Sequence, residues 1–109
     1  MKDCITLIIS LFISGSMFAQ VNVIQFNSSW NEENDYNMSE LKNCEIHYIS
    51  ICENPELIKD LNIISVPTII ILDNGQEIER FGGGIMMEIK ATQKEIQEEI
   101  DKLLLAKFN

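Results

Sequence analysis

The run Val21 to Phe26 and the turn that follows it constrain the fold of this chain most. The run is mostly apolar on both of its alternating faces, as in a strand that is covered on both sides. Beyond it the sequence becomes acidic, because Asn31 is followed by Glu32 and Glu33. An asparagine cap followed by acidic residues is typical of a helix N-terminus. We therefore expect a buried strand that leads into a helix over Glu32 to Asn43.

The first nineteen residues differ in composition from the rest. Lys2 precedes an apolar run from Ile5 to Phe18, which ends at Ala19. This pattern is typical of a secretory signal peptide, and the run is shorter than the ~20 residues that a membrane span needs. We therefore expect a signal peptide over residues 1–19, an extracytoplasmic protein (periplasmic or secreted) and no membrane contact after cleavage. The less favoured alternative is a leader that is retained as a membrane anchor. The remaining residues, 20–109, are few enough to form one domain around one core.

The composition argues against several kinds of function. The net charge is −9 and the eight Lys and Arg residues are scattered, whereas a nucleic-acid binder needs them clustered. The single histidine, His47, has no second His or Cys at a ligand spacing, so we interpret it as a core or rim residue. We therefore expect no nucleic-acid partner, no metal site and no cofactor.

Apolar patterns predict three further strands and two further helices. The strands cover Glu45–Ile51, Val66–Leu72 and Glu77–Phe81. One helix begins at Asn54-Pro55 and ends at Asn62, and its inward residues are Leu57, Ile58 and Leu61. The last helix is capped by Thr92, and its inward residues are Ile96, Ile100, Leu103 and Leu104.

The order of the predicted elements is β-α-β-α-β-β-α, which indicates an α/β fold. We expect two right-handed βαβ crossovers that share one sheet, with a hairpin through Asn74-Gly75 as its antiparallel edge. Met86 and Met87 follow three glycines, and we expect them to fill a gap under the last helix.

The cysteines are interpreted as structural. Removal of the leader also removes Cys4, and Cys44 and Cys52 then bracket one predicted strand. Eight residues at ~3.3 Å each separate these two thiols by about 26 Å, too far for a disulfide. We expect both to be small buried hydrophobes. If the chain uses a thiol, Cys52 is the better candidate, because it stands at a strand end just before a helix start.

In order and spacing, these features resemble the thioredoxin family. The markers are an apolar strand followed by Trp30, the Asn54-Pro55 helix start, Val66-Pro67-Thr68, the Asn74-Gly75 hairpin and a glycine after the last strand. The resemblance runs from Val21 to about Leu105. It implies a thioredoxin-like fold around a mixed four-stranded sheet, trimmed at its N-terminus because the leader takes the place of the family's first strand and helix.

The resemblance also implies a changed active site. It places Asn31-Glu32-Glu33-Asn34 where thioredoxins carry Cys-Gly-Pro-Cys. In the family the first cysteine attacks as a thiolate held at a helix N-terminus and the second resolves the mixed disulfide, and amide side chains can do neither. Gln25 falls at the family's buried acid, and glutamine cannot take its proton. No catalytic role is therefore expected for Asn31 or Asn34.

The family's binding surface is implied to remain. In thioredoxins a cis peptide bond precedes the proline that corresponds to Pro67, and the backbone of the residue before it pairs with an extended peptide. The alternative is that the proline is kept only for folding. Glu32 and Glu33 would make such a groove acidic, although glutamates in a first helical turn are more often solvated partners of the helix dipole. The candidate binding residues are Trp30, Glu32, Glu33, Val66, Pro67, Gly82 and Gly83.

Two classes of function follow. The first is a secreted thioredoxin-like domain without the dithiol site, which binds an extended peptide or protein as a binding or chaperone-like module. The second is a thiol-disulfide oxidoreductase that works through one relocated cysteine, Cys52 or Cys44. A stabilising subunit of a larger protein is a third reading.

Overall fold

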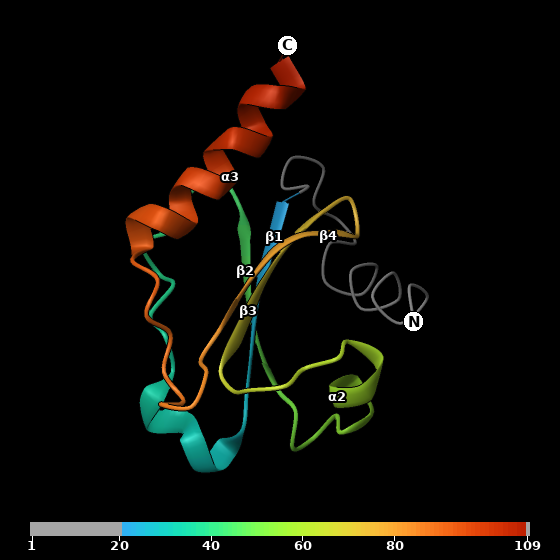
Figure 1. Ribbon diagram of the computed structural model, residues 1–109. Helices are drawn as coiled ribbons and strands as arrows, with labels where there is room; N and C mark the ends of the chain where they lie inside the picture. Colours follow the sequence, from blue (N-terminus) through green and yellow to red (C-terminus); the bar gives the residue numbers. More distant parts are fainter. Residues whose placement is uncertain (1–20, 109) are drawn as a thin grey trace.

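The structure is a computed structural model that describes residues 21–108 (Figure 1). Four strands, one 3₁₀ helix and two α-helices follow one another. In chain order they are β1 (Val21–Asn27), η1 (Ser29–Asn34), β2 (Glu45–Ser50), α2 (Glu56–Asp60), β3 (Thr68–Asp73), β4 (Gln76–Gly82) and α3 (Gln93–Phe108). The predicted mixed four-stranded sheet is confirmed, and its strand order is β2-β1-β3-β4. The predicted leader, residues 1–19, lies outside the described residues.

The strand directions differ from the prediction in one connection. β1 and β2 are parallel, but β3 is antiparallel to β1 and to β4. The connection through α2 therefore joins antiparallel strands, and the expectation of two βαβ crossovers was wrong. The segment between β2 and β3 stays at the end of the sheet where β2 ends, because Leu57 and Leu61 are buried in the core there, and β3 begins at that same end beside Phe26.

The predicted helix over Glu32 to Asn43 was also wrong. The chain forms the short 3₁₀ helix η1, within which Asn31 departs from helical geometry with φ −115° and ψ 18°. Residues 35–43 are irregular. Asparagine and serine side chains compete for backbone groups here, as when Asn37 Oδ1 accepts a hydrogen bond from the Ser39 amide at 2.9 Å. Met38 and Leu41 are buried as anchors of this irregular segment.

Side chains connect the irregular segment to the start of α3, and the two stretches run side by side (Figure 1). The Tyr36 hydroxyl donates to the Ala91 carbonyl at 2.8 Å. Gln93 donates to the Asn37 carbonyl at 3.0 Å. The Gln97 side chain bonds both backbone groups of Lys42, at 2.9 and 3.0 Å. These hydrogen bonds thus satisfy backbone groups of the irregular segment that would have been paired with one another in an α-helix.

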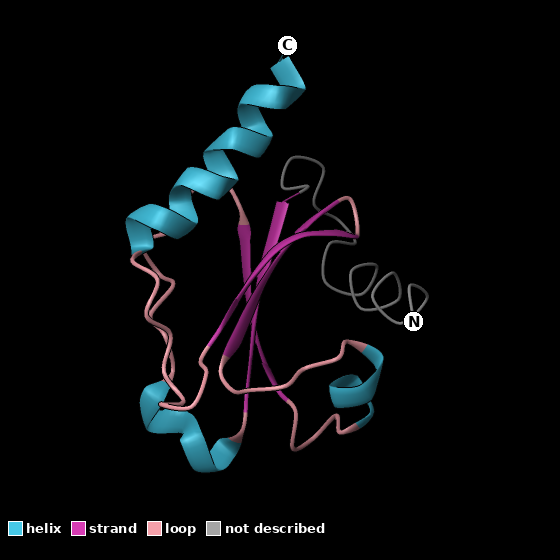
Figure 2. Cartoon of the chain, in the orientation of Figure 1, coloured by secondary structure: helices cyan, strands magenta, loops and turns pink. Residues whose placement is uncertain are grey.

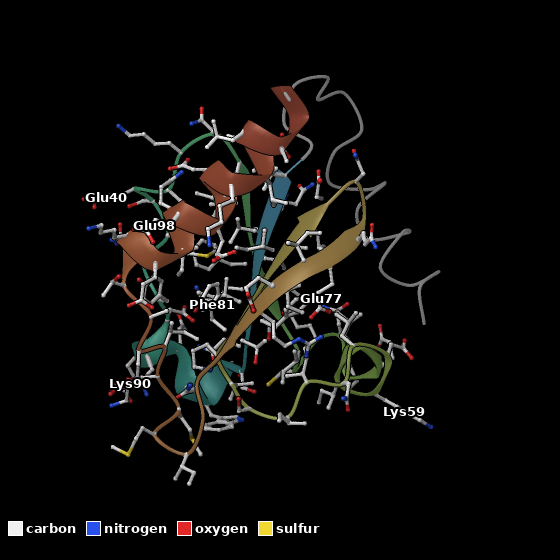
Figure 3. All side chains as sticks on the ribbon, turned by 45° about the horizontal axis from the view of Figure 1, so that its top comes forward. Glu40, Lys59, Glu77, Phe81, Lys90 and Glu98 are labelled. Atoms are coloured by element: carbon white, nitrogen blue, oxygen red, sulfur yellow. The ribbon has the colours of Figure 1, made fainter. Side chains whose placement is uncertain are left out.

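Both faces of the sheet are covered, as the apolar run of β1 predicted (Figure 2). Every residue of β1 is buried. One core lies on the α2 side, and its buried residues are Ile24, Phe26, Ile51, Leu57, Leu61, Ile63, Val66, Ile70 and Leu72. The other lies on the α3 side, with Val21, Val23, Met38, Leu41, Ile69, Ile71, Ile96 and Ile100. Lys59 on α2 and Glu98 on α3 point away from the sheet (Figure 3).

The helix ends were predicted in part. The start of α2 differs, because Pro55 occupies the N-cap position and the Asn54 side chain donates to the Ser50 carbonyl at 3.1 Å instead of capping the helix. The Thr92 hydroxyl accepts a hydrogen bond from the Glu95 amide at 3.1 Å, as in the predicted cap of the last helix. Asn62 has a left-handed backbone with φ 54°, which ends the turn after α2. Ile58 is a correction, because it was expected to face inward and 41% of it is exposed. Within residues 21–108, no helix is long and apolar enough to cross a membrane.

Candidate functional site

The strand register brings four connections together at one end of the sheet. Asn27 at the end of β1 lies opposite Ser50 at the end of β2. Thr68 at the start of β3 pairs with Gly82 at the end of β4 and lies next to Phe26 of β1. The segments beyond these residues must therefore cluster there: η1, the turn after β2, residues 65–67 and residues 83–87.

An apolar groove of about 570 Å³ lies among these segments. We call it the apolar groove, and the residues that line it are Ser28, Trp30, Ile51, Ile58, Ile63, Ile64, Ser65, Val66, Gly84, Ile85 and Met87. The structure thus brings together Trp30 and Val66 from the predicted binding residues. Pro67, Gly82 and Gly83 support the groove from below, and neither Glu32 nor Glu33 lines it.

The floor of the groove is the loop that leads into β3. The Val66-Pro67 peptide bond is cis. The Gly83 amide donates to the Pro67 carbonyl at 2.8 Å, and a Cβ at position 83 would lie 2.8 Å from the Val66 carbonyl oxygen. Glycine is therefore required for this close approach. In the described part of the chain, the amide and the carbonyl of Val66 have no hydrogen-bond partner.

The walls of the groove carry large apolar side chains that face solvent. Trp30 is 62% exposed, Ile64 90% and Ile85 96%. Met86 and Met87 are exposed beside them, so the expectation that they fill a gap under the last helix was wrong. The reason is a turn in which Gly84 and Met87 both have positive φ and the Met87 amide donates to the Gly84 carbonyl at 3.2 Å. This turn directs the residues between them outward.

A second pocket, of about 290 Å³, lies on the other side of Ser28. Three of its lining residues are acidic, and we call it the acidic pocket. Its residues are Gln25, Asn27, Ser28, Ser29, Glu32, Asp35, Tyr48, Ile49, Ser50 and Glu53. Glu32 therefore faces this pocket instead of the apolar groove, and Glu33 lines neither of the two.

Asparagine side chains form a hydrogen-bonded network at the end of β1. Asn31 is only 4% exposed, and its Oδ1 accepts from Asn34 Nδ2 at 2.8 Å. Asn31 Nδ2 donates to Asn27 Oδ1 and to the Met87 carbonyl, each at 3.1 Å. Asn27 Nδ2 donates to the Asn31 carbonyl at 3.0 Å and to Asp35 Oδ1 at 2.6 Å. Asn31 and Asn34 are thus bonded to each other, and Asn31 also holds one wall of the apolar groove.

Solved structures were compared with this arrangement. Schistosoma mansoni thioredoxin matches with a TM-score of 0.62 and 17% identity, over 86% of this chain and 85% of that chain. A mutant thioredoxin of Halobacterium salinarum matches with a TM-score of 0.59 and 18% identity, over 77% and 74%. Fasciola hepatica thioredoxin matches with a TM-score of 0.59 and 17% identity, over 86% and 89%. The chain has a thioredoxin-like fold. No family model and no curated protein sequence matches it.

A thioredoxin-like fold does not by itself fix the chemistry of its site. The cysteines stand at positions 4, 44 and 52, so no two are three residues apart. Asn27, which completes the asparagine network, was not predicted from the sequence to take part in it. A polar residue at the end of a wholly buried strand is the signal that could have identified it, because a buried amide needs partners.

Gln25 makes a pair of hydrogen bonds for which an ionised acid would be unsuitable. It is buried, its Nε2 donates to the Tyr36 carbonyl at 2.8 Å, and its Oε1 accepts from the Tyr36 amide at 2.8 Å. A carboxylate has acceptors only and would face the carbonyl without a donor. The amide therefore fixes the irregular segment after η1 to the central strand.

The two described cysteines have opposite environments, and both are free thiols. Cys44 is half-buried, and burial raises its pKa to about 11. Cys52 is exposed, which corrects the expectation that it is buried, because β2 ends at Ser50 and Cys52 lies in the turn beyond it. A hydrogen bond from the Ser29 amide, and then one from the Ser29 hydroxyl 3.6 Å away, lowers the pKa of Cys52.

His47 lies on β2, away from the groove, as a partly buried residue. Its Nε2 is 3.2 Å from Asn22 Oδ1 and 3.5 Å from Glu45 Oε2. Burial lowers its pKa more than the Glu45 carboxylate raises it. Residues 21–108 contain no group of three His, Cys, Asp or Glu side chains arranged to hold a metal ion.

Proposed function

We propose that this chain is a secreted thioredoxin-like module that binds an extended apolar segment of a peptide or protein and does not catalyse dithiol exchange. The observation that carries the proposal is the apolar groove, with Trp30, Ile64 and Ile85 mostly exposed around the free backbone of Val66. Exposed apolar side chains gathered around a concave surface are characteristic of an interaction site.

The groove offers both parts of strand-type recognition. The amide and carbonyl of Val66 can pair with the backbone of an extended segment, and the surrounding apolar walls can accept its side chains. Burial of one large apolar side chain contributes about 1.5–3 kcal/mol, and part of this is offset by the ordering of the segment. Two or three such side chains therefore contribute about 3–9 kcal/mol before the cost of association is subtracted.

Loss of dithiol chemistry is supported by the asparagine network. Asn31 is buried, and its side-chain oxygen and nitrogen are both engaged in hydrogen bonds. The sequence supplies no pair of cysteines three residues apart. Secretion is supported by the apolar leader of residues 1–19.

The binding proposal is tested with Trp30, which is the only tryptophan in the chain. Titration with an extended peptide of apolar residues is expected to shift the Trp30 emission to shorter wavelength and to saturate. The Ile64→Asp variant is expected to bind at least about tenfold more weakly, because it places a charge in the groove. Leu105→Asp is the matched control, since Leu105 is also apolar and exposed but lies on α3. Absence of saturable binding to any such peptide would refute the proposal.

The chemical part is tested by the reduction of a protein disulfide with dithiothreitol. No acceleration over the uncatalysed rate is expected when the protein is added. Acceleration that is lost in Cys52→Ser would replace the proposal with the second candidate.

That second candidate is a single-thiol oxidoreductase, and the lowered pKa of the exposed Cys52 is the observation that favours it. The Cys52 thiolate would attack one sulfur of a substrate disulfide and form a mixed disulfide, and the other sulfur would leave as a thiolate. An external thiol would then have to resolve the intermediate. Cys44 is unsuited to this role, because its pKa is raised to about 11 by burial.

A further inference from the structure

The partner that suits the apolar groove is indicated by the charges beside it. We propose that the occupant is an extended segment in which a lysine or arginine stands next to the apolar residues. The apolar residues occupy the groove and the basic side chain enters the acidic pocket. This inference rests on the proposed function, and it adds the charge of the segment.

The two concave surfaces are neighbours on the same few residues. Ser28 lines both of them. Trp30 lines the apolar groove and Glu32, two residues later in the same short helix, lines the acidic pocket. Consecutive residues of an extended segment are about 3.3 Å apart and alternate in direction. A segment that crosses Ser28 can therefore present an apolar side chain to one surface and a basic side chain to the other.

The acidic pocket has unbalanced negative charge. Glu32, Asp35 and Glu53 line it together with hydroxyl groups, and no Lys, Arg or His does. Within residues 21–108, none of these three carboxylates forms an ion pair. The Lys and Arg side chains of residues 21–108 that form ion pairs do so with Glu77, Glu88 and Glu99, which do not line this pocket.

Carboxylates and hydroxyls are the acceptors that an ammonium or guanidinium group requires. An acidic segment would be repelled at the same place. The pocket therefore both attracts basic segments and rejects acidic ones. The net charge of −9 over the whole chain acts in the same direction, because it favours the approach of basic partners.

The test compares three peptides with one apolar sequence and a lysine, a glutamine or a glutamate at the adjoining position. Binding to the full chain is followed by Trp30 emission. We expect the lysine peptide to bind about three- to fivefold more tightly than the glutamine peptide, and the glutamate peptide to bind most weakly. The differences should shrink in high salt, because these carboxylates are exposed to solvent.

Charge-neutralising variants locate the preference. Glu32→Gln combined with Glu53→Gln is expected to remove most of the preference for lysine, so that the lysine and glutamine peptides bind with nearly equal affinity. Glu33→Gln is the matched control, since Glu33 is adjacent and exposed but lines neither surface. Equal melting temperatures of the variants show that the fold is retained.

The two proposals fail in different ways. If neither the lysine peptide nor the glutamine peptide binds, the proposed function is wrong and this inference falls with it. If the glutamine peptide binds and the three peptides have equal affinities, only this inference is overturned. A lysine preference that persists in the Glu32→Gln and Glu53→Gln variant also overturns it, because the discriminating charge then lies elsewhere.

Discussion

The asparagine network and the apolar groove lie on neighbouring residues at one end of the sheet. They differ in whether their chemical groups have partners within the described residues. In the network, the buried amides of Asn27 and Asn31 bond to each other, to backbone carbonyls and to the exposed Asn34, so that they are satisfied within the chain. In the groove, large apolar side chains face solvent and the backbone of Val66 has no partner in the described residues. The network therefore supports the fold, whereas the groove stays open to solvent, as the proposed binding function requires.

Asn31→Ala breaks the network and has the largest expected effect. It leaves Asn27 Oδ1, Asn34 Nδ2 and the Met87 carbonyl without this partner. We expect a loss of about 3 kcal/mol in the free energy of unfolding, measured by urea denaturation, because buried polar groups are then unsatisfied. Asn34→Ala removes one bond of an exposed residue and should cost about 1 kcal/mol. Equal losses in the two variants would show that Asn31 is not the centre of the network.

Gln25→Glu tests whether the buried amide beside the network has to be neutral. The carboxylate would lose the bond to the Tyr36 carbonyl and face it with like charge, so we expect a loss of about 2 kcal/mol at pH 7. A protonated carboxyl can donate as the amide does. The folded chain therefore holds this proton more tightly than the unfolded chain, and the deficit should be small at low pH and grow as the pH rises. A deficit that does not depend on pH, in unfolding curves at pH 4 and pH 7, would contradict this reading.

Gly83→Ala disturbs the groove and spares the network. Its Cβ would meet the Val66 carbonyl oxygen at 2.8 Å, where the neighbour is backbone and cannot rotate away. We expect about 1–2 kcal/mol of destabilisation and a several-fold loss of affinity in the Trp30 titration. Gly82→Ala is the control, because its Cβ would meet only the movable Ser65 hydroxyl at 3.2 Å. Unchanged affinity in Gly83→Ala would show that the backbone of Val66 does not contribute to peptide binding.

Alkylation of the two thiols is expected to have the smallest effect on stability. It tests which of the two cysteines is accessible and reactive. At pH 8, Cys52 should react with iodoacetamide well before Cys44, because the pKa of Cys52 is lowered and that of Cys44 is raised to about 11. The Cys44 rate should rise as the pH approaches 11, as more of its thiolate forms. Peptide mapping by mass spectrometry assigns the labels, and urea-unfolded protein, in which the two rates converge, is the control. Faster labelling of Cys44 in the folded protein would reverse this assignment.

Regular elements were predictable from the sequence because their signals are local. The Thr92 cap and the spacing of Ile96 and Ile100 were sufficient for α3. The apolar run of β1 correctly indicated a strand covered on both sides. The direction of β3 was not predictable in this way, since it depends on where the segment between β2 and β3 packs against the sheet and not on the composition of either strand.

The site was less predictable, because its amides act over long distances in the sequence. Asn31 has the appearance of a helix cap, yet its side chain bonds to the Met87 carbonyl, 56 residues away. Trp30 and Val66 were placed together by the resemblance to thioredoxins. The position of Glu32 in a separate pocket, the exposure of Met86 and the exposure of Cys52 follow from how turns direct side chains, which spacing alone does not reveal.

The hydrogen bonds between the irregular segment and the start of α3 also impose an order on biosynthesis. The irregular segment is joined to residues 91–97 by bonds that span 55 or 56 positions. A ribosome adds residues at about 5–20 per second. The segment after η1 is therefore synthesised several seconds before the amides and carbonyl that hold it in place. Until then the nascent chain holds the irregular segment without the partners that fix it to α3, although every residue that lines the groove, from Ser28 to Met87, has already been added.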